Sequence, residues 1–278
     1  MRTHQGGDHE RVDPGSGPAG GATGAASSWR ELAPIAAGFV LIWLVLDQTA
    51  SRSGSLYGEF GLAVGAATVA TAVAVEMILY RRRPLAALRF LGYGRPAARA
   101  MVVALLIGLV LLALLPVMAR LTGARLSLRP DWWWLVPGLF AQHGLAEETL
   151  FRGFTFHHLR AGRGFWRAAT LSLVPFAAIH VLLLAFLPPA LALTSVVVAV
   201  AFAFPAARLF ESGRNTIWAP ALVHFFAHLL KLIDPAEITV PLQLAWSGAV
   251  LAVPYLAFVG LRPTGPAGDR AGAAGAGP

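Results

Sequence analysis

Residues 101–119 read MVVALLIGLVLLALLPVMA, a run in which no side chain is charged. A run of about 20 apolar residues is long enough to cross the hydrocarbon core of a bilayer as an α-helix. In the whole chain of 278 residues, 56% are hydrophobic and only 13% are charged, whereas about a quarter of the residues of a soluble domain are charged. The sequence therefore predicts an all-α, polytopic membrane protein.

Other apolar runs have a similar length, and about eight transmembrane helices are expected. Their approximate ranges are 33–50, 60–80, 99–119, 133–152, 167–187, 190–208, 215–232 and 240–261. The fourth to seventh are the least regular, because they contain charges or prolines. The membrane domain would cover residues 33–262. It is flanked by a cytoplasmic tail (1–28) and a Gly/Ala/Pro-rich tail (263–278), both expected to be disordered.

The distribution of basic residues predicts the orientation. With eight spans and a cytoplasmic N-terminus, 17 of the 22 arginines and lysines lie on the inner side. The five on the outer side are Arg52, Arg120, Arg125, Arg129 and Lys231, the only lysine. Because cytoplasmic loops collect positive charge, both termini are expected inside the cell. The abundance of Ala, Gly, Arg and Pro suggests a bacterial plasma membrane, and the net charge of +8 does not indicate nucleic-acid binding.

Several kinds of site are excluded by residues or motifs that the sequence lacks. It contains no cysteine, so it has no disulfides, no thiolate nucleophile and no cysteine-ligated zinc. Gly-x-Ser-x-Gly, His-Glu-x-x-His and P-loop motifs are also missing, which removes the support for serine-hydrolase, thermolysin-like and nucleotide-binding functions.

Charged residues in the fourth predicted span indicate a functional site, because a charge at the bilayer centre costs ~2.5–3.5 kcal/mol. Residues 143–152 read HGLAEETLFR. Glu148 and Arg152 are four residues apart and are expected to form a structural ion pair on one helix face. Glu147 would point about 100° away from them, as an unpaired acid that could do chemistry. His143 would lie on the same face as Glu147.

Three further histidines lie in other predicted spans. His180 is in the middle of the fifth, where it could act as a general base or, alternatively, as a packing residue that bonds a neighbouring helix. His224 and His228, in the seventh, share one helix face. They could bind a metal ion or hydrogen-bond a substrate oxygen, and packing is the alternative for them too.

A glutamate and histidines from two other helices suit hydrolysis if they converge. Glu147 could take a proton from a water molecule that His180 helps to hold and polarise. His224 and His228 could then donate hydrogen bonds to the oxyanion that forms. Glu147 and Glu148 lie near the inner end of their predicted span, which favours access from the cytoplasm.

Three spaced motifs resemble, in the same order, those of the CPBP family of intramembrane proteases: Glu147-Glu148-x-x-x-Arg152, Phe176-x-x-x-His180 and His224-x-x-x-His228. This family contains CAAX prenyl endopeptidases and bacterial Abi or bacteriocin-processing relatives. The resemblance covers about residues 133–232. It implies that Glu147 is the catalytic acid/base, that His180 is its partner on the water, and that His224 lies on the oxyanion side.

One position departs from the family pattern, because the third motif commonly ends in asparagine and here ends in His228. Histidine keeps a hydrogen-bond donor at this position, and it can also bind zinc. The family is described both as metalloproteases and as glutamate-dependent enzymes. We expect a reaction that requires no cofactor. A Zn²⁺ site formed by Glu147, His180, His224 and His228 is the alternative.

The expected function is that of an intramembrane endopeptidase that acts on a peptide or a membrane protein, with Glu148 and Arg152 supporting the site. Two other functions remain open. A non-catalytic scaffold or immunity protein would use the polar residues only to fix helix packing. A proton- or metal-coupled transporter would use them as a relay, and it would be expected to have broken helices in two repeated halves.

Overall fold

The computed structural model describes residues 29–54, 57–185 and 189–261. The two tails expected to be disordered, residues 1–28 and 263–278, lie outside these ranges. The described residues form helices without any strand, and one antiparallel bridge pairs Leu128 with Ile233. The prediction of an all-α fold is confirmed.

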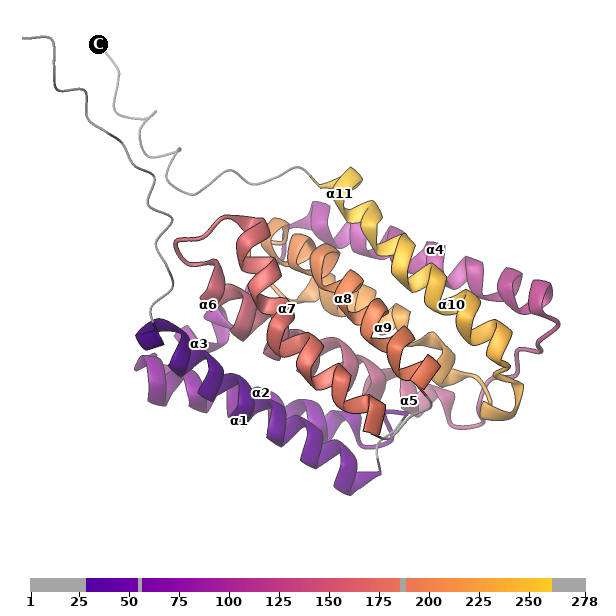
Figure 1. Cartoon of the computed structure of the whole chain (residues 1–278), viewed down its shortest axis with the longest axis horizontal. Helices are drawn as coiled ribbons and strands as arrows, with labels where there is room; N and C mark the ends of the chain where they lie inside the picture. The colour runs from indigo at the N-terminus through magenta and orange to yellow at the C-terminus, as the bar shows by residue number, and fades with distance from the viewer. Residues whose placement is uncertain (1–28, 55–56, 186–188, 262–278) are drawn as a thin grey trace, which may run out of the picture.

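The helices follow one another through short connections (Figure 1). The first part of the chain forms α1 (Trp29–Ser53), α2 (Gly61–Tyr80), α3 (Pro84–Phe90), α4 (Ala98–Thr122), α5 (Trp132–Leu139), η1 (Phe140–Ala146), η2 (Thr149–Phe156) and α6 (His157–Arg160). The second part forms α7 (Phe165–Val181), η3 (Leu182–Ala185), α8 (Pro189–Ser212), α9 (Trp218–Ala227), η4 (Leu229–Leu232), η5 (Pro235–Glu237), α10 (Val240–Ala252), η6 (Val253–Tyr255) and α11 (Leu256–Gly260).

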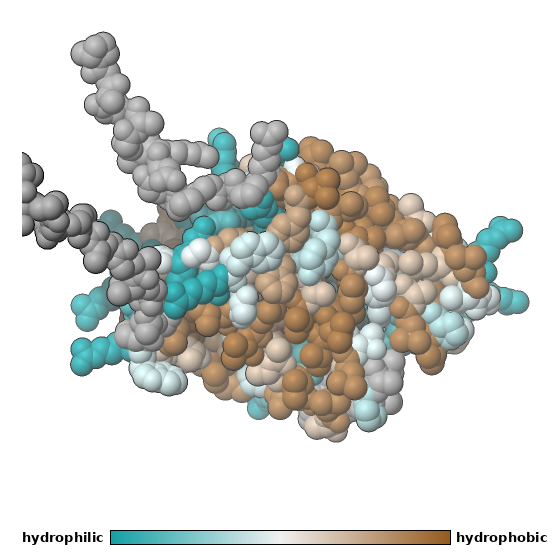
Figure 2. All heavy atoms as spheres, turned by 45° about the horizontal axis from the view of Figure 1, so that its top comes forward, coloured by the Kyte–Doolittle hydropathy of each residue, from teal (hydrophilic) through white to brown (hydrophobic). Residues whose placement is uncertain are grey.

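Five helical segments are long and apolar enough to cross a membrane: Trp29–Ser53, Gly61–Tyr80, Ala98–Thr122, Ala192–Ser212 and Val240–Gly260. They correspond to five of the eight predicted spans. Apolar side chains cover much of the flank between the two ends of the molecule, and hydrophilic side chains gather at those ends (Figure 2). The chain is therefore a multi-pass helical membrane protein. The other three predicted spans contain the candidate site residues, which are polar. The helices of these spans are shorter than the five long ones or change winding along their length.

Two clusters of buried apolar side chains form the core. One cluster joins α4, α5, α8, α9 and α10, and the other joins α1, α2, η2, α7 and α8. The α1–α2 hairpin and the α4–α10 pair lie on opposite flanks of the bundle (Figure 1). Between these flanks runs a continuous helical segment, Trp132–Arg160, which contains the first predicted motif. All eight residues of η2 are buried.

This central segment is wound differently from the α-helix that the sequence analysis assumed. Phe140–Ala146 and Thr149–Phe156 are both π-helical, with only Glu147 and Glu148 between them in α-helical conformation. A π-helix is wider, with i→i+5 hydrogen bonds, and occurs frequently at functional sites. On either side of the two glutamates, the segment therefore does not turn by the about 100° per residue that an α-helix would give. Both predicted i,i+4 contacts, His143–Glu147 and Glu148–Arg152, are nevertheless present.

Close backbone contacts hold the segment on both sides of the glutamates. A Cβ atom on Gly138 would overlap the carbonyl oxygen of Gly58, and one on Gly61 would overlap that of Gly138. A Cβ atom on Gly153 would likewise overlap the carbonyl oxygen of Leu91. Glycine lets these backbones touch, so the glutamates are held between fixed points.

A polar cluster lies at the end of the bundle next to α3. His158 Nε2 lies 2.7 Å from Glu76 Oε1, and His157 Nδ1 lies 2.7 Å from the carbonyl oxygen of Phe90. Glu76 is fully buried and also accepts a hydrogen bond of 2.9 Å from Arg82. These residues bind α2, α3 and α6 together.

Candidate functional site

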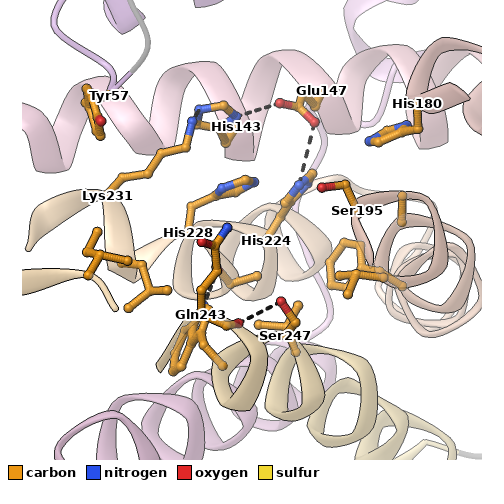
Figure 3. Close-up of a pocket in the computed structure, with 18 of the residues that line it drawn as sticks. Tyr57, His143, Glu147, His180, Ser195, His224, His228, Lys231, Gln243 and Ser247 are labelled. Carbon is orange, nitrogen blue, oxygen red and sulfur yellow. Dashed lines mark hydrogen bonds and ion pairs between the residues drawn. The ribbon is translucent and has the colours of Figure 1, made fainter. Parts of the chain in front are cut away.

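A cavity of about 760 Å³ lies among η1, α7, α8, α9 and α10. Its walls contain the glutamate and the three histidines that were expected to converge, Glu147, His180, His224 and His228. His143 and Lys231 join them (Figure 3). Residues far apart in the sequence therefore meet in one polar cavity inside an apolar bundle.

Glu147 is held by a neighbour on its own helical segment. His143 Nδ1 lies 2.6 Å from Glu147 Oε1, as expected for residues on one face. The description of Glu147 as an unpaired acid was wrong, because His143 occupies one of its two oxygens. Its second oxygen, Oε2, lies 3.6 Å from His224 Nε2. The Glu147 side chain is 18% exposed, so water can reach it from the cavity.

His224 lies between the two adjacent glutamates. Its Nδ1 is 2.7 Å from Glu148 Oε1, and its Nε2 faces Glu147. An ionised carboxylate only accepts hydrogen bonds, so Nδ1 carries the proton that it donates to Glu148. Glu148 thereby fixes both the ring orientation of His224 and the tautomer of its neutral form.

The predicted pair of Glu148 and Arg152 is present and buried. Arg152 Nη1 donates to Glu148 Oε1 over 2.9 Å, and the two side chains are 3% and 0% exposed. The guanidinium lies 5.4 Å from the ring centres of both Phe176 and Phe202. A buried pair of this kind is often architectural. Here it also supports His224, which the sequence analysis did not foresee.

His180 reaches the cavity from α7 and points toward Glu147 (Figure 3). Its Nδ1 lies 2.8 Å from the carbonyl oxygen of Phe176 in the preceding helical turn. Since a carbonyl only accepts, Nδ1 is the donor, and Nε2 is an acceptor when the ring is neutral. His180 thus presents a lone pair to the cavity.

His228 lies at the end of α9 and stacks on two other imidazoles. Its ring centre is 4.1 Å from that of His143 and 5.1 Å from that of His224. The shared face predicted for His224 and His228 is therefore present.

The possible metal ligands differ from the expected set. Among the described residues, one group of three can approach a common ion, namely His143, Glu147 and His228, with donor atoms within 4.8 Å of one another. His180 and His224, which the alternative zinc site included, do not belong to this group. Two histidines and one glutamate are a known ligand set of catalytic zinc, so these three residues fit such an ion.

Lys231 is a residue of the site that sequence reasoning missed. Its ammonium nitrogen lies 3.0 Å from His143 Nε2, so the chain of contacts Lys231–His143–Glu147 extends from η4 into the cavity. The sequence analysis counted Lys231 only among the basic residues on the outer side. A signal was available, because this only lysine of the chain follows His228 by three positions in a predicted span. Tyr57, Ser195, Gln243 and Ser247 also line the cavity, and no motif marked them.

The fold and the site together define a multi-pass membrane protein with an acid–histidine cluster inside its helical bundle. Residues 129–230 match the family model for Rce1-like proteins, described as type II CAAX prenyl endopeptidases. This match confirms the resemblance that the three motifs predicted, over the part of the chain that contains them. Comparisons with curated proteins and with solved structures gave no match.

Proposed function

We propose that this protein is an intramembrane endopeptidase in which Glu147 activates the water that attacks a peptide bond. The observation that carries this proposal is the position of Glu147 on the cavity wall, with Oε1 held by His143 and Oε2 facing His224. A carboxylate oriented in this way is prepared to accept a proton from water. The endopeptidase family matched by residues 129–230 supports the same reaction class.

His180 would share the attacking water with Glu147. Its Nε2 can accept a hydrogen bond from that water, because Nδ1 is already used on the Phe176 carbonyl. The water would give one proton to Glu147 as its oxygen bonds to the substrate carbonyl carbon. Glu147 would then pass this proton to the leaving amine, as a general acid.

His224 and His228 would stabilise the oxyanion of the tetrahedral intermediate. For His224 this role requires the imidazolium form, since Nδ1 already donates to Glu148 and Nε2 must carry a second proton to donate. Glu148 and Arg152 would act indirectly, by holding His224 in place. Donors fixed before the reaction stabilise developing charge most effectively.

Hydrolysis assisted by a bound zinc ion is a second candidate mechanism, because the arrangement of three side chains favours it. His143, Glu147 and His228 have the ligand types and the spacing that a zinc ion would need. The ion would lower the pKa of a bound water to ~7 and polarise the scissile carbonyl. We favour the metal-independent reaction, since Glu147 can serve as the base without being a ligand.

The same proposal includes eight membrane crossings with both termini in the cytoplasm. Besides the five long helices, the segment Trp132–Arg160 and the apolar helices α7 and α9 run along the bundle between its two ends. Polar residues in the middle of these segments, such as Glu147, Glu148 and His224, face the cavity or a neighbouring helix. In lipid, polar residues are expected at such positions.

The test is hydrolysis of a fluorogenic peptide library by the purified full-length protein, with and without a zinc chelator. Glu147→Gln has nearly the same volume and is the matched inactive control. We expect cleavage by the wild type that the chelator leaves unchanged and that Glu147→Gln abolishes. Loss of cleavage on chelation with recovery on added zinc would instead establish the zinc mechanism. Equal cleavage by the wild type and by Glu147→Gln would overturn both the metal-independent and the zinc mechanism.

A further inference from the structure

The cavity occupies only one half of the bundle's length. Its lining residues from connections include Tyr57, between α1 and α2, and Pro235 and Ile238, between α9 and α10. In the helical spans Ala192–Ser212 and Val240–Gly260, the lining runs from Ser195 to Phe202 and from Gln243 to Val250, so from the same end it reaches no further than the middle of each span. Among the described residues, none of the lining comes from the connections at the other end. The cavity therefore reaches toward the end that bears the α1–α2 connection.

The opposite end of the bundle is rich in arginine. It contains α3 and α6, on the left of Figure 1, and α11, at the top of the picture. Twelve arginines lie there: Arg30, Arg81, Arg82, Arg83, Arg89, Arg95, Arg99, Arg160, Arg163, Arg167, Arg208 and Arg214. Among the described residues, three acidic residues accompany them: Glu31, Glu76 and Glu211. This end therefore has a large surplus of positive charge.

The end toward which the cavity reaches has no such surplus. Its five basic residues are Arg52, Arg120, Arg125, Arg129 and Lys231, and its five acidic residues are Asp47, Glu59, Asp131, Asp234 and Glu237. One of the five positive charges, that of Lys231, faces the cavity instead of the outer surface. Three tryptophans at 132–134 begin the central segment at this end, as is typical of a membrane interface.

We propose that the cavity opens on the extracytoplasmic side of the membrane, and that its substrate is an extended polypeptide segment presented from that side. Positive residues remain in the cytoplasm, so the arginine-rich end lies inside the cell and the cavity end outside. The nature of the substrate rests on the proposed function, whereas the direction of access rests on geometry and charge alone. This replaces the expectation of cytoplasmic access, which depended on placing Glu147 near the inner end of its span. In the structure, Glu147 lies midway along Trp132–Arg160.

The size of the cavity limits what can enter. Its volume of about 760 Å³ lies within the range of ~300–1,000 Å³ that holds a drug-sized molecule. A few residues of an unfolded chain fit this space, and a folded domain does not. The substrate class is therefore an exported or outward-facing polypeptide, cut within a short extended stretch.

The absence of cysteine from the sequence allows a direct test, because any single cysteine introduced is the only thiol. Three positions report on the cavity end of the bundle, on the cavity itself and on the arginine-rich end. Ala236 is exposed in η5 at the cavity end, and Ser247 lines the cavity. Gly164 is exposed at the arginine-rich end, where an added Cβ meets open space. Ser247→Cys is conservative, since its hydroxyl bonds only a carbonyl oxygen of its own helix, that of Gln243.

The full-length variants would be expressed in bacterial spheroplasts and treated with a membrane-impermeant, charged maleimide, before and after permeabilisation. We expect Ala236→Cys and Ser247→Cys to be labelled in intact spheroplasts, and Gly164→Cys only after permeabilisation. Labelling of Gly164→Cys from outside would overturn the orientation. Labelling of Ala236→Cys but not of Ser247→Cys from outside would overturn the direction of access. Labelling does not depend on catalysis, so this result stands apart from the peptidase assay.

Discussion

Lys231 Nζ lies 3.0 Å from His143 Nε2, on the opposite side of the imidazole from Glu147. An ammonium group has only donors to offer, so it donates to Nε2 and leaves the ring proton on Nδ1. That proton is then directed at Glu147 Oε1. The lysine thereby fixes the tautomer of His143 and, through it, the orientation of the carboxylate.

Lys231→Met should lower kcat about tenfold, because losing one hydrogen bond of ~1.5 kcal/mol to a positioning group changes a rate by that factor. Substrate KM should change little if Lys231 acts by holding His143, which its ammonium group contacts. Steady-state kinetics on the best library peptide would measure both constants. A raised KM with unchanged kcat would contradict the positioning role and make Lys231 a substrate-binding residue.

Arg152→Met should destabilise the protein by about 3–5 kcal/mol, since it removes one partner of a buried ion pair. Glu148 would then remain charged and fully buried, with His224 as its partner. The double variant Glu148→Met/Arg152→Met should recover most of this loss, because replacing both charges by apolar groups is often neutral. Denaturant unfolding in mixed micelles would measure the free energies. A cost below ~1 kcal/mol for the single variant would show that the pair contributes little to stability.

His228→Asn should keep kcat within about tenfold of the wild type, because asparagine retains a hydrogen-bond donor for the oxyanion. His228→Ala removes the donor and should lower kcat about 10²–10³-fold. The two variants are compared with the same peptide and with their zinc content determined. If both are equally inactive and both lose bound zinc, the metal mechanism replaces the metal-independent one.

Gly138→Ala should destabilise the protein by about 1–3 kcal/mol, because overpacking forces a backbone shift. The new Cβ would overlap the carbonyl oxygen of Gly58. Gly248→Ala is the matched control, since its Cβ meets open space in α10. Alanine there should be neutral or stabilising by up to ~1 kcal/mol. Equal thermal unfolding midpoints for both variants would show that the close approach of α5 to the α1–α2 connection is not a constraint.

Much of the fold could be predicted from the sequence, because lipid exposure leaves long apolar runs. The predicted ranges 60–80 and 99–119 differ from α2 and α4 by at most three residues at either end. The 133–152 range was the least accurate: the helix continues to Arg160. Its π-helical winding depends on packing against neighbouring helices and has no signature in hydrophobic periodicity.

The candidate site was predicted where its residues follow helical spacing. The contacts His143–Glu147 and Glu148–Arg152 are both i,i+4 pairs and both exist. The contact of His224 with Glu148 and that of Lys231 with His143 join residues 76 and 88 positions apart. Spacing within one helix says nothing about such pairs, since they depend on how α9 and η4 dock against the central segment.

The central claim is that Glu147 is the base that activates water, and Glu147→Gln tests it most directly. Glutamine keeps the size of the side chain and can still bond His143, but it cannot accept a proton from water at neutral pH. Single-turnover hydrolysis of the best peptide should fall at least about 10³-fold with Glu147→Gln. Glu147→Gln should also unfold at nearly the wild-type temperature. Hydrolysis by a folded Glu147→Gln within about tenfold of the wild-type rate would contradict the claim.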